Sequence, residues 1–247
     1  MIKIIQQCWN THRQLMNDPQ IKDCLVKSSI PILWFGDMDA YNLSKIKVVT
    51  VGLNPSLREF PKDKDRFPNA VSLQNKKTLN AKDVETYTAA MNAYFETDPY
   101  KKRFNNFEKA LNPLDSSYYV DKKMPNRAIH IDIYTPFATD PVWGGLSPKQ
   151  KEYIDKRSNG LYENLLDILK PKVVLVSANK DVVKEHFPID FKDYLSDTDT
   201  RRNYLRAGKT KEGCVVIWGK NNRGCPFNIN KVTLEEKIKQ IKKDYKL

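Results

Sequence analysis

Four short apolar runs stand out in the pattern of polar and apolar residues along the chain. Each run is rich in valine and isoleucine and shows little alternation, as is typical of strands that helices cover on both faces of a parallel sheet. The runs are Ile46–Val51, Ala128–Ile133, Val173–Val176 and Cys214–Trp218. The pattern therefore predicts a central four-stranded parallel sheet.

Segments with helical spacing of apolar residues lie before, between and after these runs. They are the opening residues to about Cys24, then Val84–Glu96, Tyr100–Leu111, Pro148–Leu169 and Lys180–His186. A last helix is expected to begin near Thr233, which can cap it, with Glu235 and Glu236 close to its positive end. The alternation predicts a three-layer α/β/α fold, in which a ligand binds beyond the carboxyl ends of the strands.

The chain has 247 residues, and neither an internal repeat nor a linker rich in glycine, serine or proline divides it. We therefore expect a single domain over residues 1–247 with a helical extension at its start. No run of about 18 apolar residues occurs, and the opening residues lack the basic head and apolar centre of a signal peptide. These features favour a cytoplasmic protein with no membrane partner, and we expect it to be a monomer.

The chain carries a formal net charge of +12, from 42 lysines and arginines against 30 aspartates and glutamates. Such a charge attracts polyanions, which makes DNA the first partner to test. The alternative is that the excess lysine only keeps the protein in solution. The cysteines form no CxxC pair of the kind found in zinc and iron–sulfur sites, so we expect no metal ion and no cofactor.

The loop after the first apolar run combines residues that favour close approach to a ligand. It reads Gly52-Leu53-Asn54-Pro55-Ser56. Gly52 lets the backbone come close to a ligand, and Pro55 rigidifies the turn that presents Asn54. The alternative is an ordinary turn, because Asn-Pro-Ser is favourable turn chemistry anywhere.

This loop resembles the first motif of the uracil-DNA glycosylase superfamily, a Gly-x-Asn/Asp-Pro loop after the first strand of the sheet. The likeness extends to the order of elements over about residues 30–245, and it is nearest to the branches that carry Asn in this loop, including mismatch-specific and single-strand-selective enzymes. The resemblance implies a four-stranded parallel sheet whose strand-end loops hold DNA and accept an extruded base. It also implies that Gly52, Leu53 and Ser56 lie beside that base.

Hydrolysis of a deoxyribose N-glycosidic bond passes through an oxocarbenium-like state and needs a positioned water. The amide oxygen of Asn54 suits that task. Because the amide is neutral, we expect slower catalysis than in family members with Asp at this position. The motif holds no lysine that could act as a Schiff-base nucleophile, which favours a monofunctional glycosylase that leaves an abasic site.

Two residues bear on the substrate. Ser56 stands where the uracil-specific branch has a tyrosine that blocks 5-substituted pyrimidines, so larger bases become possible unless another side chain fills the space. Asp132 is our nearest match to an Asn that reads the pyrimidine edge and is our second catalytic candidate. A carboxylate only accepts hydrogen bonds and suits the exocyclic amine of cytosine. We therefore favour a 5-modified cytosine, such as glucosylated hydroxymethylcytosine in phage DNA, with defence against phage as the context by analogy.

Each of these residues has an alternative role. Asp132 can instead accept hydrogen bonds from loop amides, and Asp140 can add a second carboxylate to the base site. His130 lies between isoleucines, which favours a core histidine over a catalyst. The segment from Leu57 to about Lys82 is long for a connection and predicts a functional loop, in which Phe67 either stacks on a base or anchors the loop in the core, and Arg66 contacts DNA.

The last two strand ends supply further candidates for contacts to DNA. After the third run, Ser177 or Asn179 can cap a helix, or Ser177 and Lys180 can hold a phosphate. After the fourth run, Lys220 and Arg223 are expected to contact DNA, and Asn222 to polarise the leaving base. The superfamily has a His/Asn-Pro-Ser tripeptide here, which this chain lacks, so the alternative is a polar loop without that role.

Our leading hypothesis is therefore a monofunctional DNA glycosylase acting on a noncanonical pyrimidine. The second hypothesis is uracil excision in base-excision repair, and the third is a noncatalytic module that binds a modified base in DNA. A nucleotide-handling α/β enzyme is disfavoured, since the chain has neither a Walker loop nor a dinucleotide-binding fingerprint.

Overall fold

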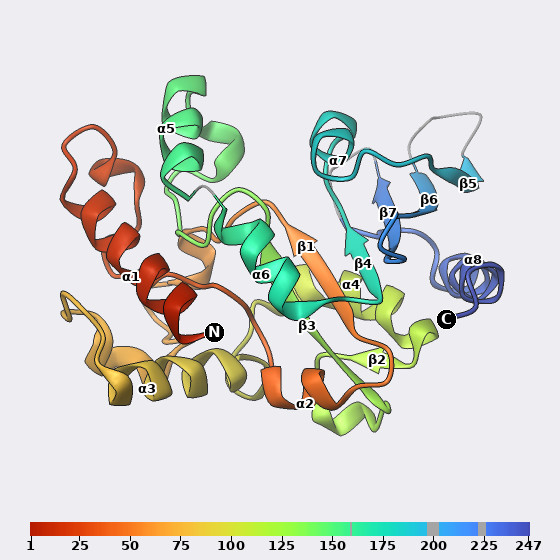
Figure 1. The fold of residues 1–247 in the computed structure, drawn as a ribbon, viewed down its shortest axis with the longest axis horizontal. Helices are drawn as coiled ribbons and strands as arrows, with labels where there is room; N and C mark the ends of the chain where they lie inside the picture. The colour runs from red at the N-terminus through yellow and green to blue at the C-terminus, as the bar shows by residue number, and fades with distance from the viewer. Residues whose placement is uncertain (159, 197–202, 222–225) are drawn as a thin grey trace. The chain divides into compact units, whose positions relative to one another are not determined.

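The computed structural model describes the whole chain except residues 159, 197–202 and 222–225 (Figure 1). Contacts group the chain into two compact units, each assembled from three segments. The first unit holds Met1–Asp37, Leu53–Tyr100 and Ile131–Leu169, and the second holds Met38–Gly52, Lys101–His130 and Lys170–Leu247. Because the chain passes repeatedly between the units, neither is a continuous stretch of sequence, and the single domain over residues 1–247 stays a prediction.

The second unit is built on a β-sheet, to which the first unit adds the last two residues of β3. Among the described residues the sheet has seven strands, in the order β2-β3-β1-β4-β7-β6-β5. They are β1 Val48–Gly52, β2 Ser116–Ser117, β3 Asn126–Asp132, β4 Val173–Val176, β5 Lys192–Ser196, β6 Asn203–Lys209 and β7 Val215–Asn221. Strand pairs β1/β4, β4/β7 and β2/β3 are parallel, whereas β5/β6 and β6/β7 are antiparallel.

The α/β class is confirmed, but the prediction of a four-stranded, wholly parallel sheet is wrong. All four predicted strands exist, as β1, β3, β4 and β7, and they lie next to one another in the sheet. The search for continuous apolar runs missed β5, which is the edge strand, and β6 beside it, because neither is apolar throughout. In β6, for example, Leu205 and Ala207 are buried, while Arg206 between them pairs with Asp193 of β5.

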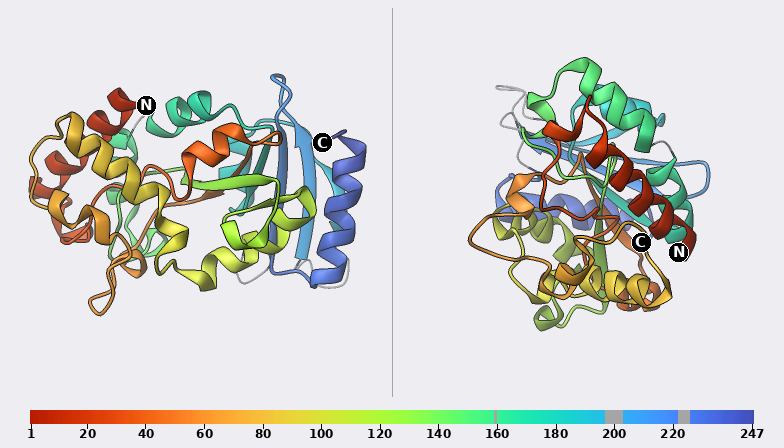
Figure 2. Two further views of the ribbon diagram at one scale, coloured as in Figure 1. Left: turned by 90° about the horizontal axis from the view of Figure 1, so that it is seen from below. Right: turned by 90° about the vertical axis from the view of Figure 1, so that its left-hand side faces the viewer.

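Helices of the second unit are α2 Met38–Leu43, α4 Lys101–Leu111, α7 Lys180–His186 and α8 Lys231–Asp244, with single 3₁₀ turns at Asn112–Leu114 and Val120–Lys122. The short α2 was not among the helices predicted from the sequence. Helix α8 runs beside the β5/β6 edge of the sheet (Figure 2), where the Asp244 carboxylate accepts a hydrogen bond of 2.7 Å from the Tyr194 hydroxyl. It begins earlier than predicted, because Asn230 rather than Thr233 caps it, accepting from Val232 N at 3.0 Å.

The first unit packs helices around an aromatic core. Its α-helices are α1 Ile2–Asn17, α3 Ala81–Asn92, α5 Pro148–Ser158 and α6 Leu161–Leu169. Its 3₁₀ turns are Lys22–Cys24, Leu57–Glu59, Pro68–Leu73, Tyr94–Glu96 and Trp143–Gly145. Helix α1 packs against α3, α5 and α6 and buries Trp9, whose ring meets Tyr87 of α3 edge-on at 6.2 Å.

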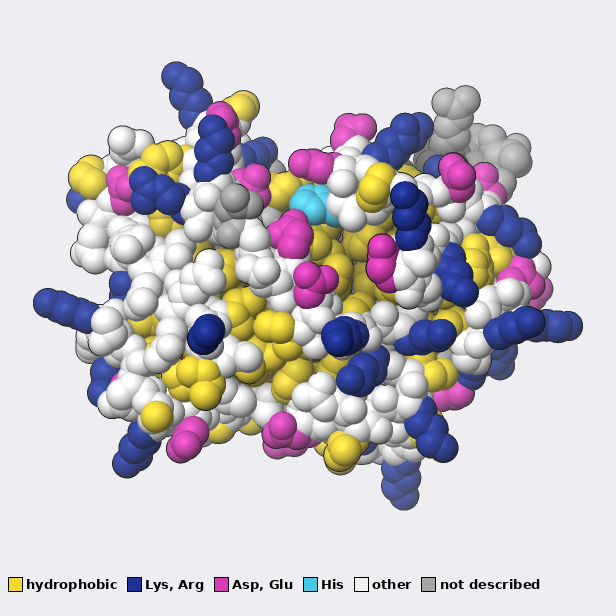
Figure 3. Space-filling model, in the orientation of Figure 1, with side chains coloured by type: hydrophobic (Ala, Val, Ile, Leu, Met, Phe, Trp, Pro, Cys, Tyr) yellow, Lys and Arg dark blue, Asp and Glu magenta, His cyan; other side chains and the backbone are white. Residues whose placement is uncertain are grey.

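The single helix predicted over Pro148–Leu169 is two helices. Gly160, between α5 and α6, has φ of 77°, a left-handed conformation that favours glycine and ends a right-handed helix. None of the helices that the structure describes is both long and apolar enough to cross a membrane. On the face drawn in Figure 3, lysines and arginines lie scattered among acidic and polar side chains.

Candidate functional site

The topology of the sheet indicates where, within the second unit, an open α/β sheet would bind a ligand. The strands that follow β1 in the chain, β2 and β3, lie on one side of it in the sheet. The strands that follow β4, which are β5, β6 and β7, lie on the other side of β4, and β1 and β4 are parallel neighbours. In open α/β sheets, ligands bind at the carboxyl ends of the strands where the order reverses in this way. Here those ends are Gly52 of β1 and the residues after Val176 of β4.

In the first unit, the loop that follows Gly52 is paired with the segment that follows β3. Leu53 O accepts a hydrogen bond from Tyr134 N at 3.1 Å, and Pro55 O accepts one from Thr139 N at 3.2 Å. Thr139 O in turn accepts from Leu57 N at 3.3 Å. These backbone bonds fix the Asn-Pro-Ser turn against a second rigid segment.

Asn54 is held by its amide nitrogen. Nδ2 donates to Thr139 Oγ1 at 2.9 Å and to Pro55 O at 2.5 Å. Thr139 is fully buried and Asn54 is half-buried. Because Nδ2 is engaged, Oδ1 is the free end of the amide, and it accepts no hydrogen bond from the residues that the structure describes. Thr139 escaped the sequence analysis, since its contact with Asn54 spans 85 positions.

The two candidate carboxylates lie in different environments. Asp132 is the last residue of β3 and is only 8% exposed, whereas Asp140 is on the surface. Asp140 is fixed through its backbone, with its N donating to Cys24 O at 3.0 Å. A buried carboxylate can orient a buried donor, and an exposed one can meet a ligand in solution.

His130 has the role of a core histidine. It is 1% exposed, its Nδ1 lies 2.7 Å from Thr50 Oγ1, and the Phe104 and Phe107 rings of α4 pack against its ring within the second unit. This is the alternative that the sequence favoured over catalysis.

An aromatic pair beside the Asn54 loop was not anticipated. The rings of Tyr134 and Trp143 stack with centroids 4.7 Å apart and planes 16° apart. Tyr134 is half-buried and bonds through its backbone to Leu53, so the pair lies against the start of the loop. The signal available in the sequence was the position of Tyr134 directly after the second apolar run.

Phe67 takes the anchoring role rather than the stacking role. It is 4% exposed and packs among Phe35, Phe60 and Tyr94, with ring centroids 6.5, 5.5 and 5.3 Å away. A ring covered in this way offers no open face to a base, so base stacking by Phe67 is not supported. Phe60, which the sequence analysis overlooked, is half-buried and has one face against Phe67.

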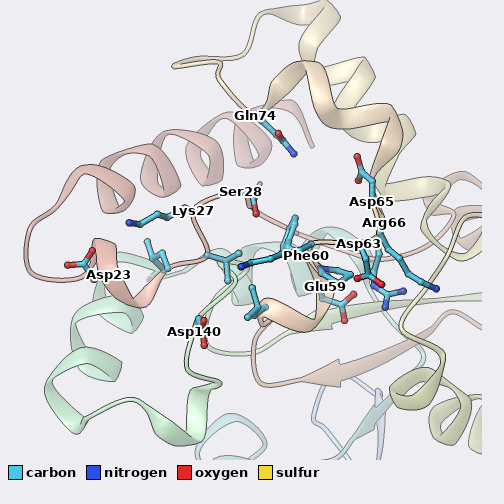
Figure 4. A pocket seen from close by; sticks show the side chains of 16 residues that line it. Asp23, Lys27, Ser28, Glu59, Phe60, Asp63, Asp65, Arg66, Gln74 and Asp140 are labelled. Carbon is cyan, nitrogen blue, oxygen red and sulfur yellow. The ribbon is translucent and has the colours of Figure 1, made fainter.

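Phe60 lines a pocket of about 730 Å³ in the first unit. Residues from the segments 23–28 and 57–66, with Gln74 and Asp140, form its walls. Figure 4 shows Phe60 between Lys27 and Ser28 on one side and the loop that carries Asp63, Asp65 and Arg66 on the other. Of the predicted site residues, Arg66 and Asp140 line this pocket, while Asn54, Ser56, Phe67 and Asp132 do not.

Arg66 is tied into the protein. Its guanidinium bonds the backbone oxygen of Asp98, lies 3.8 Å from the Asp98 carboxylate, and sits over the Tyr100 ring. Lys64 approaches the same carboxylate at 3.1 Å. If Arg66 contacts DNA, its guanidinium therefore does so while it is also bonded to Asp98.

The remaining predicted contacts belong to the second unit. Asn179 caps α7, accepting from Val182 N at 3.1 Å, which is the capping alternative. Ser177 is buried and Lys180 is exposed on the first turn of that helix. Lys220 lies in β7, but its side chain, like Asn222 and Arg223 altogether, falls outside the described residues.

Comparison of the chain with known proteins identifies no relative among those searched. No protein-family model matches the chain, and a search of curated proteins found no match to it.

Proposed function

We propose that the protein is a monofunctional DNA glycosylase, in which Asn54 Oδ1 holds the water that attacks the anomeric carbon of an extruded nucleotide. The observation that carries this proposal is the orientation of the Asn54 amide. Thr139 engages its nitrogen at 2.9 Å, so the oxygen is the end available to accept a hydrogen bond from water.

The place of Asn54 in the chain supports the same assignment. It stands two residues beyond Gly52, at the carboxyl end of a strand where the order of the sheet reverses. The net charge of +12 supplies the attraction to a polyanionic substrate. A three-layer arrangement like that of the uracil-DNA glycosylase superfamily is part of this proposal.

We favour a 5-modified cytosine as the base that is removed. Ser56 is a small residue whose hydroxyl accepts from Arg58 N at 3.3 Å and caps the turn that follows, so it adds no bulk beside the loop. Asp132 accepts and cannot donate when ionised, which suits a cytosine amine better than a uracil oxygen. Glucosylated hydroxymethylcytosine and defence against phage are the specific substrate and context that we propose.

The test is release of a base from defined DNA. Oligonucleotides that contain uracil, thymine in a mismatch, 5-hydroxymethylcytosine or its glucosylated form are incubated with the protein and then cleaved with alkali at abasic sites. We expect cleavage at a modified cytosine, with Asn54→Ala reducing the rate by about 100-fold or more, as for loss of one positioned polar group.

The other hypotheses are outcomes of the same assay. Cleavage at uracil alone would support repair in place of defence. Binding to modified DNA that Asn54→Ala leaves intact, with no free base detected by mass spectrometry over long incubation, would indicate a noncatalytic module and would overturn the proposal.

A further inference from the structure

The pocket beside Phe60 is separate from the residues assigned to the reaction. None of Asn54, Ser56 and Asp132 lines it. It nevertheless adjoins their loop, because Leu57 and Asp140 in its wall directly follow Ser56 and Thr139 in the chain. Its volume of about 730 Å³ is within the usual range for small-ligand sites.

Phe60 supplies a flat apolar surface in this pocket. Its ring stacks on Phe67 at 5.5 Å with planes 27° apart, and Phe67 is itself buried against Tyr94. This backing holds the Phe60 ring in place while leaving it partly exposed. A supported, partly open aromatic ring is the usual platform on which a nucleobase stacks.

The charges around the pocket do not make a simple polyanion site. Among the described residues, five carboxylate and four basic side chains line it. Lys64 and Arg66 are engaged by Asp98, at 3.1 and 3.8 Å. Lys27 and Lys62 are exposed and form no ion pair with any described residue, so two cations remain for an anionic group.

The carboxylates that line the pocket can bind a ligand through hydrogen-bond donors that the ligand carries. Asp63 and Asp140 are exposed and line the pocket, and an ionised carboxylate can only accept. Cytosine and adenine carry an exocyclic amine that donates, whereas the corresponding position of uracil and thymine is a carbonyl oxygen. A ligand that satisfies this pocket has a planar face, an amine and an anionic group.

We propose that this pocket is a subsite for one nucleotide whose base carries an exocyclic amine. The base lies on Phe60, its amine meets the Asp140 carboxylate, and the phosphate faces Lys27 or Lys62. The proposal goes beyond the glycosylase reaction, because it concerns a nucleotide other than the one that Asn54 would act on. In a DNA strand, this subsite would set a preference for the flanking base.

The test is equilibrium binding of nucleotides to the full chain by calorimetry or ligand-observed NMR. dCMP and dUMP form a matched pair, because they differ only in the exocyclic group at C4 and in the proton that uracil carries on N3. We expect dCMP and dAMP to bind at least about fivefold more tightly than dUMP and dTMP. Phe60→Ala should weaken dCMP about tenfold, and Phe60→Tyr, which keeps the ring, should restore it.

Asp140→Asn should reduce the preference for dCMP over dUMP, whereas Asp121→Asn, an exposed carboxylate of the second unit, should not. An oligonucleotide arm identifies the source of the ligand. Tighter, salt-dependent binding of short dC strands than of dCMP indicates a subsite for DNA, and stronger binding of dCMP indicates a free nucleotide; both support the shared chemistry.

No binding of any nucleotide, equal binding of dCMP and dUMP, or binding that Phe60→Ala leaves unchanged would overturn the proposal. These outcomes are distinct from failure of the glycosylase assignment. The protein could bind dCMP through Phe60 and release no base from any DNA, or release a base while binding no free nucleotide.

Discussion

At the scale of single residues, the geometry of Asn54 depends on Thr139. An asparagine amide can present either end to a ligand, and the hydroxyl of Thr139 selects the oxygen by engaging Nδ2 at 2.9 Å. A buried hydroxyl at 0% exposure has no water to replace that bond. Thr139 is thus a positioning residue in the proposed reaction, acting through Asn54.

We predict that Thr139→Val lowers kcat about tenfold or more with little change in KM, because the amide loses the bond that orients it while the DNA contacts remain. Thr139→Ser keeps the hydroxyl and should restore most of the rate. Steady-state kinetics of base release distinguish this positioning role of Thr139 from a purely structural one. Equal loss in both variants, or a change confined to KM, would contradict the assignment.

His12 is a second residue whose environment gives a measurable prediction. It is fully buried in α1, where burial, reinforced by the charge of Arg13, lowers its pKa to about 3. In the unfolded chain the pKa returns to about 6.5. As the pH falls, the unfolded chain therefore takes up the proton before the folded protein does. The stability that comes from keeping His12 neutral is complete above about pH 6.5 and is lost as the pH falls toward 3.

We predict that the free energy of unfolding of the wild type falls more steeply between pH 6 and pH 4 than that of His12→Gln, by up to about 1.4 kcal/mol per pH unit. Urea unfolding across this range measures the difference. His186→Gln, which changes the half-buried histidine at the end of α7, serves as the control. Parallel pH profiles for the wild type and His12→Gln would refute the prediction.

At the scale of elements, the break between α5 and α6 is localised at Gly160. A Cβ added there would meet Asn164 Nδ2 at 3.4 Å, which is ordinary contact, so the cost of Gly160→Ala comes from its φ of 77°. We expect a loss of about 1 kcal/mol in the free energy of unfolding. Gly144→Ala, with nothing within 4 Å of its added Cβ, should change it little. Equal stability of the two variants would contradict this account.

The elements also show where the sequence was informative. The strands β1, β4 and β7 are buried along their apolar runs, so their pattern identified them directly. Strand β5 carries polar residues on its exposed side and has no such run, although Tyr194 is buried. Local pattern finds elements that are apolar throughout, and it misses those whose stability depends on a partner strand.

The candidate site also contains features that the sequence predicted and features that it did not. The turn at Asn54 was visible because glycine, asparagine and proline constrain the backbone locally. The orienting contact from Thr139, the stacking of Tyr134 on Trp143 and the burial of Phe67 all join residues whose proximity only the fold creates. Phe60 and Phe67 have the same chemistry and lie in one loop, so no sequence pattern distinguishes the anchor from the open ring.

At the scale of the whole molecule, the net charge of +12 makes a prediction about DNA that no single contact makes. On the face shown in Figure 3, basic side chains are spread among acidic ones. Individual charge substitutions should therefore have small effects, whereas salt acts on all of the contacts together. Each phosphate that is neutralised adds about −0.9 to the slope of log affinity against log salt for duplex DNA.

We predict that affinity for an unmodified duplex falls at least about tenfold when monovalent salt rises from about 50 to 200 mM, which corresponds to two or more phosphate contacts. Fluorescence anisotropy with a labelled duplex measures the slope. Lys180→Ala, which removes one exposed cation, should reduce the slope by no more than about one. Affinity that does not respond to salt would mean that the positive charge serves solubility rather than DNA binding, and the glycosylase proposal would lose its account of how the protein reaches its substrate.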